Sequence, residues 1–235
     1  MTIFFKATRP DGTDFYTGLV DYAAALASGE PVTAPVVGPA DDLTFPGPAW
    51  LHLATVPTQC VGMTWPCRLY EVEPVGETFM DDAHPYKIGA RSVRVLREIE
   101  AHRVFGPQGE QVAALIERCR TLSVAEVNRL TAAWNAAARG RTRGAAAGAA
   151  LGPAAARGAA WATARDAADA ARDAAAALLC RDLIGQAPGW DQDAYDLLTG
   201  PWRDVIGPIH PDDGDGDLSS GEWVLLDALE GDSDD

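Results

Sequence analysis

The sequence has few cysteines, almost no lysine and no long apolar run, and each scarcity excludes a class of protein. No stretch approaches the roughly 20 apolar residues that a membrane-spanning helix needs. The first residues, MTIFFKATRPDG, lack the pattern of a signal peptide, so a soluble, cytoplasmic protein is expected. Cys60, Cys67, Cys119 and Cys180 match no zinc-binding spacing, so free thiols and no metal site are predicted.

The charge is strongly acidic. The chain has 19 Lys and Arg residues and 34 Asp and Glu residues, which gives a net charge of −15 at pH 7. Such a charge opposes binding to nucleic-acid phosphates and to anionic lipid. One small basic patch, formed by Arg139, Arg141 and Arg143, lies among glycines, and we interpret it as solubilising. The sequence has no glycine-rich phosphate loop and no Gly-x-Ser-x-Gly motif, and no cofactor is expected.

The chain changes character near residue 106, from β-patterned runs and turns to helical periodicity. This change predicts an α+β protein: a small mixed or antiparallel sheet domain (1–106), an alanine-rich helical domain (107–208) and an acidic tail (209–235). Runs of β-forming residues at 50–54, 67–73 and 92–99 predict strands. Asp21 is expected to cap a helix over 22–27 that ends at Gly29. The turn sequence Pro10-Asp11-Gly12 predicts a hairpin over residues 3–17.

The second part of the chain has helical spacing from residue 108 to 120. Ser123 and Glu126 then form a capping box before a helix that runs to about residue 138. Of the 24 residues from 154 to 177, 15 are alanine, which is typical of a structural strut; self-association through this helix is the alternative. Beyond residue 177 the apolar side chains fall on the side of the helix that carries the polar residues before it. Either a kink near Leu178 or packing of the last turns on a different partner is therefore expected. Residues 191–198 predict a short helix closed by Gly200, with Pro201 opening another turn.

The acidic tail contains an isolated apolar segment. Residues 211–217 resemble the start of a calcium loop, but Leu218 stands where glycine is needed and Glu222 falls before the bidentate position. A solvated linker is therefore predicted. The apolar segment that follows, residues 223–229, is expected either to dock back on the helical domain or to insert into a groove of a partner protein. The predicted partner-binding residues are Trp223, Leu225, Leu226 and Leu229.

Three segments of the first 105 residues resemble, in order, a small domain found widely in bacteriophage and prophage proteins. They are residues 50–54 with the central His52, residues 69–77 (LYEVEPVGE) and residues 92–99. That family often has a Gly-Phe-His-x-Cys run, whereas this chain has Leu51 and Leu53 beside His52 and no adjacent cysteine. The whole chain, in which Lys6 and Lys87 are the only lysines, resembles accessory-gene products of actinobacterial phages. The resemblance implies no particular activity.

An ADP-ribosyltransferase-like enzyme that uses NAD is the alternative. In such enzymes a His on an early strand and a Glu on a later one flank nicotinamide. His52 would hold a ribose hydroxyl, and Glu73, or else Glu71 or Glu77, would stabilise the developing oxocarbenium ion. The chain lacks a Ser-Thr-Ser-like strand and a late Glu-x-Glu loop. Glutamates on a solvated sheet face and a hydrogen-bonded core histidine are the simpler interpretation.

The leading interpretation is a non-enzymatic phage accessory protein that binds a host or phage protein in the host cytoplasm. The absence of a catalytic constellation, the acidic surface and the apolar segment of the tail favour it. A third interpretation, a polyanion that mimics DNA, is weakened because the carboxylates concentrate in the tail.

Overall fold

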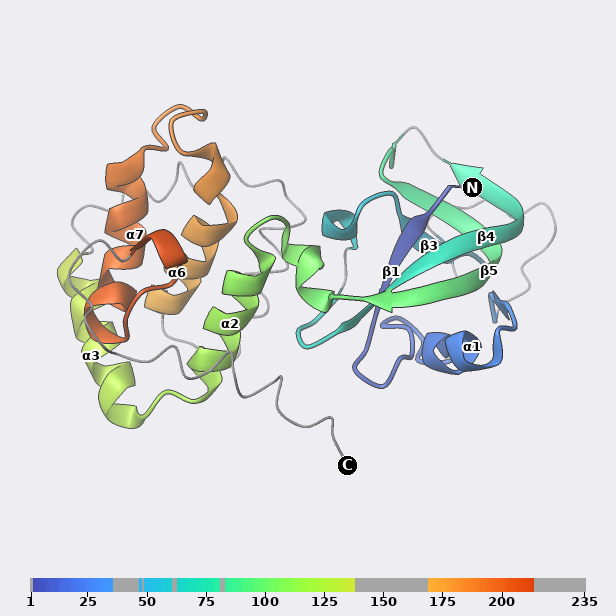
Figure 1. Cartoon of the computed structure of the whole chain (residues 1–235), viewed down its shortest axis with the longest axis horizontal. Helices are drawn as coiled ribbons and strands as arrows, with labels where there is room; N and C mark the ends of the chain where they lie inside the picture. The colour runs from blue at the N-terminus through green and yellow to red at the C-terminus, as the bar shows by residue number, and fades with distance from the viewer. Residues whose placement is uncertain are drawn as a thin grey trace.

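The computed structural model describes residues 2–35, 47, 49–60, 63–80, 83–137 and 169–213. Within them the chain is an α+β protein, as predicted, with a β lobe beside a helical lobe (Figure 1). The chain passes from strands to helices through the 3₁₀ helix η2 (Ala101–Phe105). Residues 138–168, which include most of the alanine-rich segment 154–177, lie outside the described residues, and so do residues 214–235.

The β lobe is a five-stranded antiparallel sheet that closes on itself. The strand order is β2-β5-β3-β1-β4, and β4 also pairs with β5, so that four strands form a ring. The strands are β1 (Phe4–Thr8), β2 (Val32–Thr33), β3 (Leu51–Ala54), β4 (Arg68–Met80) and β5 (Lys87–Ile99). The long β4–β5 hairpin supplies most of the ring, whereas β1 and β3 share one register pair, Phe5 opposite Ala54.

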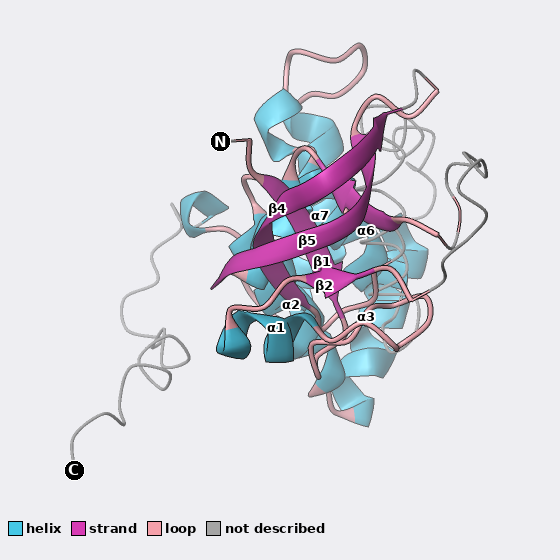
Figure 2. Ribbon diagram, turned by 90° about the vertical axis from the view of Figure 1, so that its right-hand side faces the viewer, coloured by secondary structure: helices cyan, strands magenta, loops and turns pink. Residues whose placement is uncertain are grey.

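Alternation along β4 directs its side chains into two cores. Tyr70 and Val72 pack with Tyr22 of helix α1 (Tyr22–Ser28). Leu69 joins a second cluster, which the β lobe shares with Val112 and other residues of helix α2 (Gly109–Arg120). Figure 2 shows α1 close to the strands, with α2 and the other helices behind the sheet. The two lobes are therefore joined by a common apolar core.

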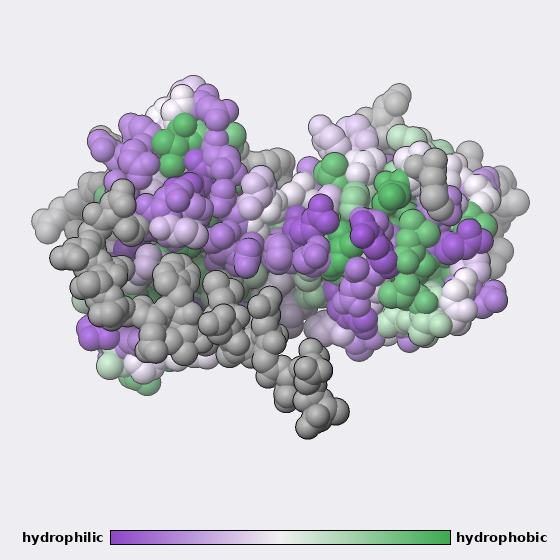
Figure 3. Space-filling view, in the orientation of Figure 1, coloured by the Kyte–Doolittle hydropathy of each residue, from purple (hydrophilic) through white to green (hydrophobic). Residues whose placement is uncertain are grey.

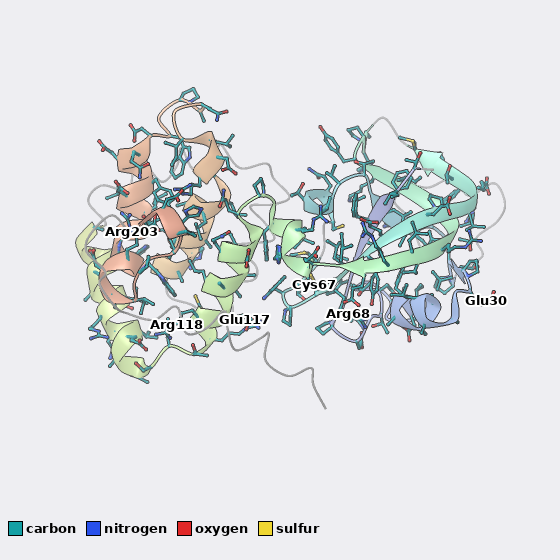
Figure 4. The ribbon with its side chains drawn as sticks, in the orientation of Figure 1. Glu30, Cys67, Arg68, Glu117, Arg118 and Arg203 are labelled. Carbon is teal, nitrogen blue, oxygen red and sulfur yellow. The ribbon has the colours of Figure 1, made fainter. Side chains whose placement is uncertain are left out.

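A ring contact and two hydrogen bonds also join the lobes. The ring centroids of Trp65 and Phe105 lie 5.1 Å apart. Trp65 Nε1 donates to Glu117 Oε1 of α2 (2.8 Å), and Arg120 donates to the Trp65 carbonyl (3.1 Å). Cys67 lies at the end of the sheet nearest the helical lobe, and Glu30 lies at the opposite end (Figure 4).

Local capping signals gave correct helix starts. The Asp21 carboxylate accepts from the Ala24 amide (2.9 Å), and α1 stops at Gly29, whose φ of 75° lies in the left-handed region that glycine tolerates. In the predicted capping box the Ser123 amide donates to Glu126 Oε2 (2.8 Å), and the Glu126 amide donates to Ser123 Oγ (3.3 Å). Helix α3 (Val124–Ala137) follows it, as predicted.

The predicted hairpin over residues 3–17 is wrong. Strand β1 pairs instead with β3 and β4, and residues 15–17 form a turn. The reason is Asp14, whose buried carboxylate collects the amides of the residues that follow it. A strand there would leave those amides to a neighbouring strand, and the carboxylate competes successfully for them.

The helical lobe is built around α6 (Asp169–Leu179) and α7 (Gln192–Val205). Ala171, Ala174 and Ala175 of α6 are fully buried, so their small side chains bring α6 close to its neighbours. Helix α6 ends at Leu179, near the predicted break, and Ala177 and Cys180 contribute to a separate cluster around Trp190. Short 3₁₀ turns complete the described chain: η1 (Pro57–Gln59), η4 (Arg181–Leu183) and η5 (Pro211–Asp213).

The predicted stop at Gly200 is wrong, because α7 continues through Gly200 and Pro201 to Val205. Its buried residues Tyr195, Leu198 and Trp202 recur at helical spacing on both sides of the predicted stop. Burial of this apolar stripe outweighs the cost of one missing backbone hydrogen bond at proline. None of the helices in the described part of the chain is both long and apolar enough to cross a membrane.

Candidate functional site

A cavity of about 250 Å³ lies beside the single register pair of β1 and β3. Its walls come from β1, the turn after Asp14, β3, η1 and the first residue of β5. The residues with polar or reactive groups in this wall are Lys6, Tyr16, His52, Gln59, Cys60 and Lys87. Phe5, Phe15 and Leu53 add apolar surface. Several polar residues from different elements of the β lobe therefore line one hollow.

Lys6 bridges the two strands where their pairing ends. Its Nζ donates to the His52 carbonyl (3.2 Å) and lies 5.5 Å from the centroid of the Tyr22 ring. Burial lowers the pKa of the Lys6 amine, and the negative charges of the Cys60 thiolate form and of Asp14 oppose that effect. The Lys6 side chain therefore links β1 to β3.

His52 lies in the same wall, on β3. Its Nε2 is 3.1 Å from the Gly47 carbonyl. Burial lowers the pKa of the imidazole, and the positive charges of Lys6 and, more weakly, Lys87 lower it further, while the contact with Gly47 raises it. The neutral ring is therefore favoured at pH 7, with Nε2–H donating to that carbonyl.

Cys60 contributes a thiol that is not activated. Burial raises its pKa to about 12, and the Ala7 amide and the Lys6 charge only partly offset this. Burial also raises the pKa values of Cys67 and Cys119 to about 12 and that of Cys180 to about 11. Because the thiolate is the nucleophile, these four groups are inert thiols at neutral pH.

The turn that closes the cavity is organised by Asp14, and we call residues 14–20 the Asp14 loop. Asp14 Oδ1 accepts from the amides of Tyr16 (3.0 Å) and Thr17 (2.7 Å), and Oδ2 accepts from those of Leu19 and Val20 (3.1 Å each). Burial opposes ionisation, but the hydrogen bonds from Thr17 and Val20 and the Lys6 charge lower the Asp14 pKa to about 2. The loop is thus held by one carboxylate.

The Asp14 loop displays apolar side chains despite this internal order. Tyr16 is 86% exposed and Leu19 is 73% exposed. Ile3 and Val56, which flank the Phe5–Ala54 pair, are also exposed. In the space-filling view, hydrophobic side chains gather on the β lobe over β1, with hydrophilic ones beside them (Figure 3).

The glutamates proposed as catalytic lie on the β4–β5 hairpin, each against an arginine of β5. Glu73 is 3.5 Å from Arg94, and Glu77 is 3.7 Å from Arg91. Glu71 is bound at two points by Arg97. His52 lines the cavity but Glu73 does not, so the structure does not bring this predicted pair together there. Trp223, Leu225, Leu226 and Leu229 lie outside the described residues.

Lys6 and Lys87 were not predicted from the sequence as site residues. The available signal was their scarcity: both lysines of the chain line the one cavity described above. In the described part of the chain, no three His, Cys, Asp or Glu residues are grouped so as to hold a metal ion. Comparison with protein-family models, curated protein sequences and solved structures found no match.

Proposed function

We propose that this chain is a non-enzymatic accessory protein of a bacteriophage that acts by binding a host or phage protein in the host cytoplasm. The observation that carries the proposal is the Asp14 loop, which presents Tyr16 and Leu19 to solvent on a backbone fixed by a buried carboxylate. The resemblance of residues 50–54, 69–77 and 92–99 to a phage domain supports the phage origin.

A fixed loop with exposed aromatic and aliphatic side chains suits recognition of a protein. Large apolar side chains supply most of the binding free energy in many interfaces, and tyrosine is enriched among such residues. Because the backbone is already ordered, little conformational entropy is lost on binding. The net charge of −15 favours a partner with basic groups around an apolar contact.

The test uses tagged chains in an actinobacterial host, followed by cross-linking and identification of the bound protein. The variant is the double substitution Tyr16→Ser with Leu19→Ser, and the matched control is Val124→Ser, a residue 78% exposed on α3. We expect the control to retain a partner that the double variant loses, and the purified partner to bind the purified chain. Equal binding by both variants contradicts a role for the loop.

The predicted tail contact is tested separately. Trp223→Asp with Leu226→Asp should abolish toxicity to the host if the apolar segment of the tail is the contact. Full toxicity of this variant, together with loss of toxicity in the Tyr16 and Leu19 variant, would indicate that the contact lies on the β lobe alone.

The NAD-dependent alternative stays a prediction with its own assay. His52 lines a cavity, which favours it, but Glu73 lies against Arg94 outside that cavity. Incubation with labelled NAD and host lysate should give transfer or hydrolysis that Glu73→Gln removes. The absence of both reactions excludes this alternative.

A further inference from the structure

The cavity between β1 and β3 borders the loop that carries the proposed protein contact. The two strands share the register pair Phe5–Ala54, and beside it residues of η1 and of the Asp14 loop complete the wall. Tyr16 lines the cavity and is 86% exposed, so its ring lies at the surface and does not fill the space. An occupant of the cavity would therefore lie beside the exposed Tyr16 ring.

The polar groups of the wall are already engaged or uncharged. Lys6 donates to the His52 carbonyl and lies over the Tyr22 ring, and Lys87 also interacts with other groups of the chain. The imidazole of His52 is favoured in its neutral form because burial and the charge of Lys6 lower its pKa. The Cys60 thiol, with a pKa of about 12, stays protonated. A charged occupant would thus give up its hydration without gaining a free counter-charge, whereas an uncharged occupant loses little.

The rest of the wall suits an aromatic ring with a polar edge. Phe5, Phe15 and Leu53 supply apolar surface, and Tyr16 adds a third ring. Aromatic rings attract one another beyond the burial of their area. Gln59 adds an uncharged amide that can accept from an indole N–H or a phenol O–H. An apolar cavity of about 150 Å³ holds benzene, so the cavity of about 250 Å³ has room for one larger aromatic side chain, such as tryptophan or tyrosine.

An aromatic side chain in a pocket is a common anchor of contacts between proteins. The residues that contribute most to such contacts are enriched in tryptophan and tyrosine, and they enter well-packed pockets whose surroundings exclude water. In this chain the cavity would be the pocket. The exposed side chains of Tyr16 and Leu19, on the ordered Asp14 loop, would belong to its surroundings.

We propose that the partner protein inserts one tryptophan or tyrosine side chain into the cavity between β1 and β3, with its ring against Phe5 and Phe15 and its polar edge at Gln59. This inference rests on the proposed function and deepens it, because it names the type of residue by which the partner is recognised.

The first experiment needs no partner protein. The whole chain, isotopically labelled, is titrated with the N-acetyl amides of tryptophan and tyrosine and followed by two-dimensional NMR, with the leucine and aspartate analogues as comparison ligands. We expect at least one aromatic amide to shift the signals of the cavity wall, the leucine analogue to bind more weakly, and the charged aspartate analogue to bind at least about tenfold more weakly. No shift at the cavity wall, or equal binding of either comparison ligand, overturns the inference.

A filled cavity should lose the same ligands. Gln59→Trp places a large side chain at the cavity from η1, and the control Asn128→Trp replaces another amide side chain at an exposed position of α3. Binding of the aromatic amides should fall at least about tenfold in Gln59→Trp and stay unchanged in Asn128→Trp. Equal binding by the two variants overturns the inference. Because the NMR mapping uses the unaltered chain, it decides the matter even if Gln59→Trp does not fold.

The partner captured in the cross-linking experiment separates this inference from the proposed function. That partner should bind Asn128→Trp and fail to bind Gln59→Trp, and the aromatic amides should compete with it. A partner that depends on Tyr16 and Leu19 but binds Gln59→Trp equally well overturns the aromatic anchor and leaves the proposed function standing. Capture of no partner contradicts the proposed function itself, whatever the amides do.

Discussion

Glu71 and Arg97 form a two-point ion pair across β4 and β5, with Nε and Nη2 of Arg97 each 2.8 Å from a carboxylate oxygen of Glu71. The hydrogen bond from Arg97 lowers the pKa of Glu71, against a smaller opposing effect of burial. Similar pairs follow the same hairpin: Glu98 with Arg68, Glu73 with Arg94 and Glu77 with Arg91. The glutamates that looked like catalytic candidates in the sequence are thus cross-strand partners of arginines.

Glu71→Gln should destabilise the chain by about 1 kcal/mol, because a nearly buried carboxylate loses a charge-assisted, two-point interaction. The matched control is Glu73→Gln, whose single contact with Arg94 is longer and more exposed and should matter less. Urea denaturation of both variants measures the difference. An equal or larger loss for Glu73→Gln would show that the geometry of the pair does not determine its contribution.

Asp14→Asn should destabilise the chain by about 2 kcal/mol at pH 7, since the carboxylate stabilises the loop only when ionised. The folded pKa of about 2 lies below the ordinary value of 3.8, so this stabilisation is complete above about pH 4 and is lost as the pH falls towards 2. The variant should lack this part of the acid dependence. Thermal unfolding from pH 2 to pH 7 provides the comparison, with Asp11→Asn in the exposed neighbouring turn as control. A variant with unchanged acid dependence contradicts the role of Asp14.

The native thiols should react slowly with an aromatic disulfide reagent at pH 8. With a pKa of about 12, against 9 for a free thiol, the Cys60 side chain holds roughly a thousandfold less thiolate. Cys60 should nevertheless react before the other three, which are more deeply buried. Stopped-flow absorbance with and without denaturant measures the rates. Fast reaction of the folded chain would mean that its thiols are activated.

Ala174→Leu should cost about 1–3 kcal/mol, because α6 packs through fully buried alanines and has no room for a larger side chain. Ala176→Leu, at a half-buried position of the same helix, is the control and should cost less. Thermal unfolding of both variants tests the packing. The alanines of α6 at 171, 174, 175 and 177 are fully buried within the lobe. Self-association through the alanine-rich segment 154–177 stays a prediction.

Features fixed by neighbouring residues were predictable, and features fixed by distant ones were not. Asp21 and the Ser123–Glu126 pair determine helix starts within three residues, so their patterns sufficed. Strand β1 pairs with β4, which lies 60 to 68 residues further along the chain, and no local pattern indicates that pairing. The Asp14 carboxylate takes the amides of the segment that was predicted to pair with β1, so the predicted hairpin does not form. Likewise, Lys87 lines the cavity because β5 pairs with β3, and no local spacing encodes that pairing.

The use of arginine at every other basic position gives this chain an unusual chemical property. Acylating reagents, aldehydes and enzymes that modify primary amines find only two side chains to attack, and both lie in the same hollow of the β lobe. A fluorophore or affinity tag attached to a lysine side chain would therefore report on that hollow, and would leave the helical lobe unlabelled.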